Sequence, residues 1–187
     1  MKVQDASIAR GEDENARSPG DPALLDLAEL LFFAYRDFTR EPDKILCEIG
    51  FGRAHHRVLH FVNRHPGMRV ANLLEILQIT KQSLGRVLKQ LVDDGFILQK
   101  AGKTDRRERL LYPTPRGKDL AERLAAPQLR RIARALETSG ADANACVEEF
   151  LRQMISDTDA SPIAQLLKNS ARRVRDEGDA GDEGSVE

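Results

Sequence analysis

Apolar residues near the start of the chain recur at the spacing of a helix. From Ala23 onward they fall three or four positions apart, at Leu24, Leu27, Leu31, Tyr35 and Phe38. This period indicates an amphipathic helix with a broad apolar face. Because a residue that precedes proline is disfavoured in the helical conformation, the run Glu41-Pro42-Asp43 is predicted to end this helix.

Three shorter helices are predicted next. The first runs from about Gly52 to Asn63 and stops at His65-Pro66-Gly67. Two further apolar sets share the spacing i, i+3, i+4, i+7, and they comprise Val70, Leu73, Leu74 and Leu77, then Leu84, Val87, Leu88 and Leu91. Thr80, between these sets, can cap the later helix with its hydroxyl. Two short amphipathic helices joined by a tight turn are typical of a helix-turn-helix.

A small hairpin and more helices are predicted to follow. Residues 96–100 and 110–112 have strand character, and the polar, glycine-containing run 101–109 suits a hairpin connection. Thr114-Pro115 then predicts a helix start, with the threonine as N-cap and the proline at the first helical position. Pro127 is predicted to kink or interrupt that long helix. A helix over roughly 142–157 and a short one from Ser161-Pro162 complete the pattern.

The fold class is therefore mainly α with a small β-hairpin wing, a winged helix-turn-helix with flanking N- and C-terminal helices. We divide the chain into a disordered arm (1–21), a first helix and linker (22–51), the winged helix-turn-helix (52–117), C-terminal helices (118–160), and a short helix with a disordered acidic tail (161–187).

Composition excludes several classes of protein. The 187 residues contain no apolar run long enough for a transmembrane helix and no signal peptide at the start, so we expect no membrane partner and a cytoplasmic location. Two cysteines 99 positions apart make neither a disulfide framework nor a four-ligand zinc site. His56 and His60, at i and i+4, supply only two metal ligands, so no metal is expected. Without a glycine-rich phosphate loop or a catalytic triad pattern, we expect no cofactor and no enzyme.

Charge is unevenly distributed along the chain. The formal net charge of −1 argues superficially against a nucleic-acid partner. However, residues 81–118 carry ten Lys and Arg against four acids, whereas residues 176–187 carry six acids and no base. When charges segregate in this way, the local balance is a better guide to partners than the average.

The basic segment coincides with two elements suited to DNA. The first residues of a recognition helix reach base edges in the major groove, so hydrogen-bonding side chains are needed there. The candidates in this helix are Thr80, Lys81, Gln82, Ser83, Arg86 and Lys89. The candidates in the hairpin are Lys103, Asp105, Arg106, Arg107 and Arg109. The hairpin arginines suit the negative potential of the minor groove, and Asp105 is expected to pair with a neighbouring arginine and hold the tip rigid.

Residues 24–157 resemble regulators of the MarR family. The stretch 70–97 is similar to the DNA-reading core of that family, Asp105-Arg106-Arg107 to its Asp-x-Arg wing signature, and Thr114-Pro115-Arg116-Gly117 to its entry into the next helix. The chain departs from the family pattern at Pro113, which suits an edge strand, at Gly85 inside the recognition helix, in the basic run 53–57, and in the extension after Asp157.

The resemblance implies an obligate homodimer built from the first helix and the last two helices. Each protomer would place a recognition helix in successive major grooves of a pseudo-palindromic double-stranded operator with half-sites about 10 bp apart. Such regulators are usually repressors, sometimes activators, and are often released by a small-molecule effector or by thiol oxidation. Tyr35, His55 and Cys47 are candidates for an effector pocket. Cys47 is either a thiol sensor or a small buried apolar residue.

One alternative remains open at this stage. A winged helix also serves as a protein-interaction or architectural module without a sequence-specific operator. Such a module is expected to lack the outward basic residues that this chain carries. Salt dependence of DNA binding distinguishes the two, since neutralising several phosphates makes affinity fall steeply with salt.

Overall fold

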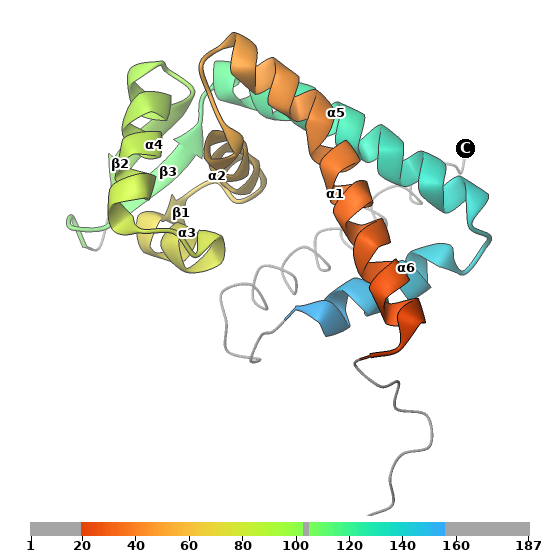
Figure 1. The fold of residues 1–187 in the computed structure, drawn as a ribbon. Helices are drawn as coiled ribbons and strands as arrows, with labels where there is room; N and C mark the ends of the chain where they lie inside the picture. The colour runs from red at the N-terminus through yellow and green to blue at the C-terminus, as the bar shows by residue number, and fades with distance from the viewer. Residues whose placement is uncertain (1–19, 103–104, 156–187) are drawn as a thin grey trace, which may run out of the picture. The chain divides into compact units, whose positions relative to one another are not determined.

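The computed structural model describes residues 20–102 and 105–155. The chain forms two compact units, Met1–Phe38 and Thr39–Glu187. Figure 1 labels the elements, which are α1 (Pro22–Glu48), α2 (Arg53–Arg64), β1 (Met68–Arg69), α3 (Val70–Leu77), α4 (Lys81–Asp93), β2 (Ile97–Ala101), β3 (Arg109–Pro113), α5 (Pro115–Thr138) and α6 (Ala143–Met154). The helix predicted from Ser161, the acidic tail and the arm up to residue 19 lie outside the described residues.

The predicted end of the first helix at Pro42 was wrong, because α1 continues to Glu48 with Pro42 inside it. Pro42 has no N–H to donate to the carbonyl of Phe38, the residue at which the first compact unit ends. Pro42 and Leu46, one turn apart, are both fully buried. The burial of this apolar surface offsets the lost hydrogen bond.

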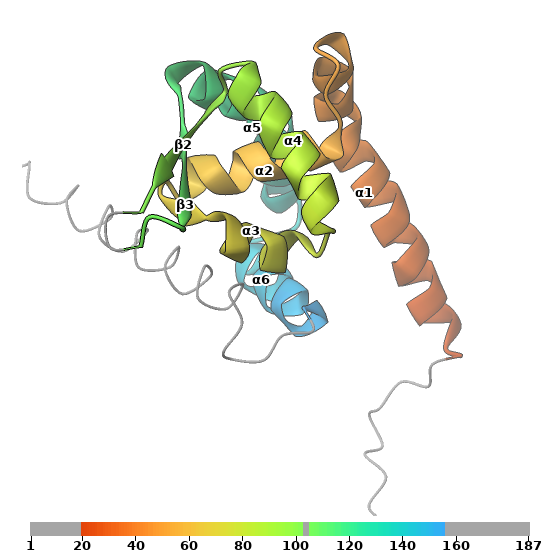
Figure 2. The same ribbon diagram turned by 90° about the vertical axis from the view of Figure 1, so that its left-hand side faces the viewer.

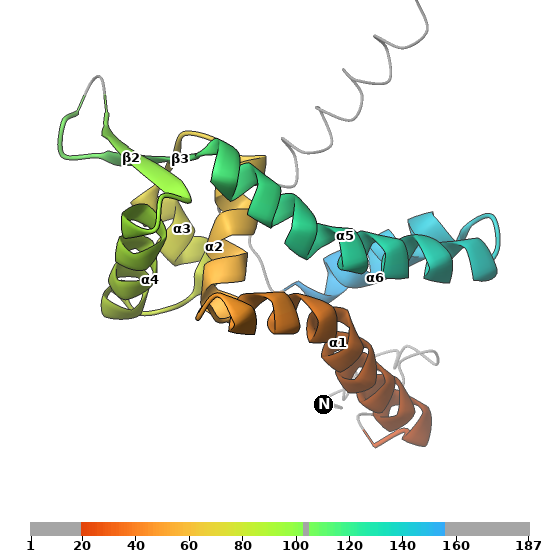
Figure 3. The ribbon, with the colours of Figure 1, turned by 90° about the horizontal axis from the view of Figure 1, so that it is seen from above.

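The sheet has three strands in the order β1-β3-β2, all antiparallel. The predicted hairpin is confirmed as β2 and β3, which Figure 3 shows beside α3 and α4. The two-residue strand β1 was missed, because so short a segment has no recognisable period. It makes β3 the central strand at Leu110 and Leu111, but at Pro113 only β2 lies alongside, which agrees with the predicted edge position. Pro113 lies at the end of β3, beyond the residues that pair with β1.

One apolar core lies beneath the helix-turn-helix and the sheet. Helix α2 contacts both α4 and α5, as Figure 2 shows, and β3 contacts α2 and α3. The fully buried side chains in this core include Val58, Leu59, Val62, Leu73, Leu84, Leu91, Ile97, Leu111 and Leu124. The predicted apolar stripes of α3 and α4 are thus the faces that the core buries.

The start of α5 is fixed against the strand β2. Thr114 caps the helix by accepting a hydrogen bond from the Gly117 N–H at 3.0 Å, as the sequence predicts. The Thr114 N–H donates to the carbonyl of Phe96 at 3.1 Å, and the Thr114 hydroxyl donates to the carbonyl of Gly95 at 2.8 Å, with the Phe96 carbonyl 3.2 Å away. A Cβ on Gly117 would lie 2.0 Å from that carbonyl oxygen, so only glycine fits there. Pro127 was predicted to kink or to interrupt this long helix. It lies inside a continuous α5, so the interruption does not occur.

Helix α6 buries none of its residues. Its apolar side chains Val147, Phe150, Leu151 and Met154 are each about half exposed and repeat at i, i+3, i+4, i+7. An isolated helix of this length is marginal in water. Among the described residues, no helix is both long and apolar enough to cross a membrane.

Candidate nucleic-acid interface

The first turn of α4 presents polar side chains on a well-capped helix end. The Oγ1 of Thr80 accepts a hydrogen bond from the Ser83 N–H at 3.1 Å and donates to the Ser83 Oγ at 2.9 Å. Thr80 and Ser83 are thereby held in place at the helix start. Lys81 and Gln82 lie beside them and are exposed. The N-terminus of a helix favours negative charge, so this end of α4 suits a phosphate or an electronegative base edge.

The outward face of α4 continues along the helix through Arg86 and Lys89, both exposed. Lys89 forms an ion pair with Asp93 one turn later. The hydrogen bond and charge of that carboxylate raise the pKa of Lys89. Part of the charge of Lys89 is thus already neutralised within the helix, whereas the first two turns of α4 contain no acidic residue.

Helix α4 is tied to α2 by His55. The Nδ1 atom of His55 accepts a hydrogen bond from the Gly52 N–H at 3.1 Å, and Nε2 lies 3.0 Å from the Oε1 of Gln90. With Nδ1 as acceptor, the proton belongs on Nε2, which then donates to Gln90. The ring also stacks on Phe51 at 4.5 Å. Sequence reasoning missed this positioning role, because Gln90 is 35 residues away.

The wing is stiffened by hydrogen bonds among its own residues. The Oδ1 of Asp105 accepts from the backbone N–H of Arg107 at 2.8 Å, and the Asp105 carbonyl accepts from the N–H of Glu108 at 3.1 Å. Asp105 was expected to pair with an arginine side chain, but its recorded partner is the arginine backbone. Arg106 and Arg107 are exposed, while Arg109 donates to the Arg106 carbonyl at 3.3 Å. Lys103 lies outside the described residues.

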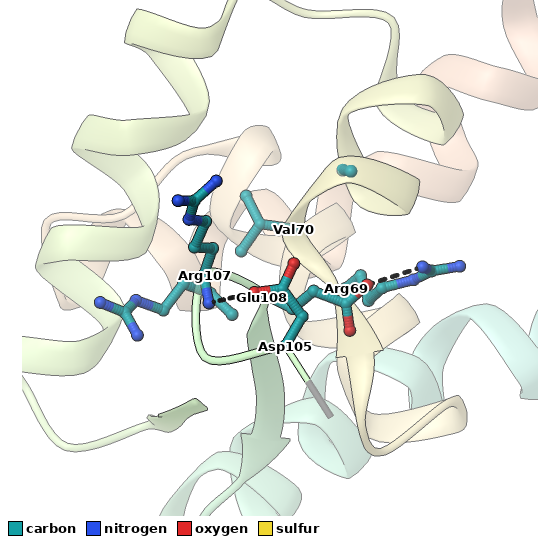
Figure 4. Close-up of a pocket in the computed structure, with 7 residues that line it drawn as sticks. Arg69, Val70, Asp105, Arg107 and Glu108 are labelled. Atoms are coloured by element: carbon teal, nitrogen blue, oxygen red, sulfur yellow. Dashed lines mark hydrogen bonds and ion pairs between the residues drawn. The ribbon is translucent and has the colours of Figure 1, made fainter. Parts of the chain in front are cut away.

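An ion pair connects the wing to the start of α3. Arg69 Nη1 lies 2.9 Å from Glu108 Oε1, and Arg69 Nε donates to Asn72 Oδ1 at 3.1 Å. Arg69 and Glu108 border a pocket that Figure 4 shows, and its lining comprises Arg69, Val70, Ala71, Asp105, Arg107, Glu108 and Arg109. Neither Arg69 nor Glu108 is among the site residues predicted from the sequence. Arg69 occupies the N-cap position of α3, where a short polar residue is usual, and this departure was the one sign of a separate role for Arg69.

The three effector-pocket candidates lie on different parts of the chain. Tyr35 is in the first compact unit, while Cys47 and His55 are in the second. Cys47 is exposed, so its interpretation as a small buried apolar residue was wrong. Both ring nitrogens of His55 already have partners within the fold, which assigns its ring a structural role.

Two histidines on α2 have pKa values below the ordinary value of 6.5. Burial lowers the pKa of half-buried His56, and the charge of His60 adds to this while Asp43 opposes it. Desolvation, with help from Arg64, also lowers the pKa of His60. No group of three or more potential metal ligands occurs among the described residues.

We expect these two histidines to make stability fall as the solution becomes mildly acidic. The unfolded chain binds protons at pH values where folded His56 and His60 stay neutral, so unfolding takes up protons. Their contribution is complete above pH 6.5 and is lost as the pH falls through 6.5 towards their lowered values. The check is urea denaturation at pH 7.5 and 5.5 for the natural protein and for His56→Gln. An equally steep loss in the variant would contradict the assignment to His56.

Comparison with known proteins places this interface in a family. The family model of the MarR family matches residues 49–108. The HTH-type transcriptional regulator PetP of Rhodobacter capsulatus is 42% identical over 161 residues, covering 82% of this chain and 96% of PetP. The HTH-type transcriptional repressor Mb2911 of Mycobacterium bovis is 28% identical over 137 residues, covering 64% and 99% of the two chains.

Solved structures share the fold. A MarR family regulator from Silicibacter pomeroyi superposes with a TM-score of 0.59 at 19% identity, covering 68% of this chain and 86% of that one. A mutant of MarR from E. coli in complex with operator DNA gives a TM-score of 0.55 at 19% identity, covering 74% and 99%. The named relatives regulate transcription and are not enzymes. This chain therefore belongs to the MarR family of transcriptional regulators.

Proposed function

We propose that the protein acts as a homodimeric repressor that binds a pseudo-palindromic site in double-stranded DNA. The observation that carries the proposal is the two-sided character of α4. One face is buried through Leu84, Val87, Leu88 and Leu91, and the other presents polar and basic side chains beside a basic wing. Because the core buries only the apolar face of α4, the face that carries the hydrogen-bonding groups stays exposed to solvent.

The first two turns of α4 supply the contacts in the major groove. Gln82 and Arg86 have side chains that pair with base edges, Arg with guanine and Gln with adenine. Lys81 and Ser83 suit phosphate oxygens near the helix N-terminus. Thr80 holds this turn in place through its cap, and Lys89 contributes less because Asp93 already pairs with it.

The wing supplies the second contact. Arg106 and Arg107 are exposed near its tip, and the narrow minor groove favours arginine. Asp105 holds the turn through the Arg107 backbone, and the Arg69–Glu108 ion pair attaches the loop between β2 and β3 to the start of α3. A wing held at both places loses less conformational entropy on binding DNA.

The dimer is proposed from the apolar surface left exposed on a single chain. The stripe of α6 is half exposed and includes no buried residue, and the first half of α1 exposes Leu25, Leu30, Phe32 and Phe33 by more than half. Contiguous exposed apolar surface marks an association site. A second copy is the occupant that a two-fold operator requires.

Repression, and release of the DNA by a signal, are two further parts of the proposal. The repressing sense is supported by Mb2911, which is named a repressor. An effector or a thiol signal that releases the DNA stays a prediction. Of its candidate residues, Tyr35 and Cys47 are exposed, whereas His55 is held in the fold.

The proposal is tested by selecting bound sequences from random duplex DNA with the purified full-length protein and measuring affinity at several salt concentrations. We expect one enriched two-fold site with half-sites about 10 bp apart. We also expect affinity to fall steeply with salt because several phosphates are contacted. Weak binding without an enriched site would contradict the proposal and favour an architectural or protein-interaction module.

Replacing Arg107 by alanine is expected to weaken binding to the selected site by about 1–3 kcal/mol, because a cationic contact in a groove is lost. Affinity is measured by fluorescence anisotropy at fixed salt. Arg123→Ala is the matched control, since Arg123 is an exposed arginine on α5. Unchanged affinity in a folded Arg107→Ala protein would contradict the role of the wing.

A further inference from the structure

Gly85 lies in the middle of the outward face of α4. Gln82, Gly85, Arg86 and Lys89 are all exposed and are spaced i, i+3, i+4, i+7, so they share one side of the helix. The residues buried on the opposite side are Leu84, Val87, Leu88 and Leu91. The face that carries the proposed base contacts therefore has a gap where one side chain is missing.

The fold itself does not require glycine at this position. Gly85 is within a regular helix and is not among the glycines with positive φ. A Cβ added to it would meet no atom of the described chain within 4 Å. Gly117, in the first turn of α5, differs because its Cβ would collide with a backbone carbonyl. Glycine is among the poorest helix formers, so it weakens α4 without a compensating contact inside the protein.

The gap at Gly85 has an apolar lining. Side chains three and four positions apart are neighbours on a helix surface, so the gap is bordered by Lys81 and Gln82 on one side and by Leu88 and Lys89 on the other. The stems of the polar side chains among them are methylene groups, and their polar ends extend outward. The backbone N–H and carbonyl of Gly85 are engaged in the helix. A group that enters the gap therefore finds CH groups and no hydrogen-bonding partner.

The major groove offers one apolar group, the C5 methyl of thymine. We propose that Gly85 is a specificity-determining residue, and that its missing side chain admits the C5 methyl of one thymine in each half-site. This inference rests on the proposed function, because it takes the outward face of α4 to be the face that meets the bases. It assigns a preference for thymine at one position, in addition to the contacts of Gln82 and Arg86.

The first test is Gly85→Ala, which separates stability from binding. Alanine is the better helix former and has room in the free protein, so the melting temperature is expected to rise by about 2–4 °C. The added methyl group fills the gap, so affinity for the selected site is expected to fall by about tenfold. Gly52→Ala is the matched control, since Gly52 also has open space around a Cβ but lies at the N-cap of α2. The control is expected to leave affinity unchanged.

The second test replaces each thymine of the selected half-site, one at a time, by deoxyuridine, which lacks only the C5 methyl. At one position the natural protein is expected to lose about fourfold in affinity, the equilibrium effect of one methyl group left unburied. At that position Gly85→Ala is expected to lose little, because its own methyl group already occupies the gap. Such non-additivity between protein and DNA changes is the signature of direct contact.

Three results would overturn this inference while leaving the proposed function standing. They are undiminished affinity in Gly85→Ala, the absence of any deoxyuridine position that weakens the natural protein, and deoxyuridine effects of equal size in both proteins. In each of these cases the natural protein still selects a two-fold site. Failure of the natural protein to select any site would instead contradict the proposed function, and with it the premise of the inference.

Discussion

Replacing Gly117 by alanine is expected to destabilise the protein by about 3 kcal/mol or more, because the added methyl group clashes with backbone atoms in a position that has no free space. The new Cβ would lie 2.0 Å from the carbonyl oxygen of Phe96 and 3.0 Å from its carbonyl carbon. These are backbone atoms, which cannot rotate away as a side chain does. The first turn of α5 and the start of β2 must therefore separate.

That separation also breaks hydrogen bonds that hold the two elements together. The Phe96 carbonyl accepts from the Thr114 N–H, while the Thr114 hydroxyl donates to the neighbouring Gly95 carbonyl and accepts from the Gly117 N–H. The free energy of unfolding is measured by urea denaturation. Gly85→Ala is the control, because it adds the same methyl group in a helix where a Cβ meets nothing, and it is expected to stabilise. A Gly117→Ala protein as stable as the natural one would contradict the close contact.

Local signals in the sequence predicted most of the helix-turn-helix correctly. The period of α3 and α4, the Thr80 cap and the Thr114-Pro115 start all depend on residues within one or two turns of each other. The predicted helix end at Pro42 and the interruption that was one of two outcomes predicted at Pro127 did not occur, for one reason. Pro42 and Pro127 are both buried within continuous helices, and that burial depends on contacts with distant parts of the chain. Propensity alone therefore placed breaks where tertiary packing prevents them.

The candidate site shows the same division between local and distant information. The outward residues of α4 and the exposed wing arginines were readable from charge and spacing. The residues that hold them were not, because Arg69 meets Glu108 across 39 positions and His55 meets Gln90 across 35. Even the partner of Asp105 was misjudged, since a carboxylate two residues before an N–H forms a local turn. Sequence thus indicated the exposed groups that we propose to face DNA, and the structure supplied those that position them.

Replacing Phe150 by glutamate is expected to convert the protein to a monomer and to lower its affinity for a two-fold site by more than about 100-fold. Phe150 is 50% exposed within the apolar stripe of α6, which buries no residue within its own chain. A charge placed in an apolar interface must be desolvated without a partner, so association becomes unfavourable. A monomer engages one half-site at a time and loses the effective concentration that links two binding modules.

The oligomeric state is measured by sedimentation velocity, and the affinity by anisotropy with the selected operator. Gln153→Glu is the matched control, because it adds the same charge to α6 beside Glu149 rather than in the stripe, and it is expected to stay dimeric. Circular dichroism checks that Phe150→Glu remains folded, as expected since Phe150 lies outside the buried core. A dimeric Phe150→Glu protein would contradict the interface. A monomer that still binds the whole operator tightly would contradict the need for two recognition helices.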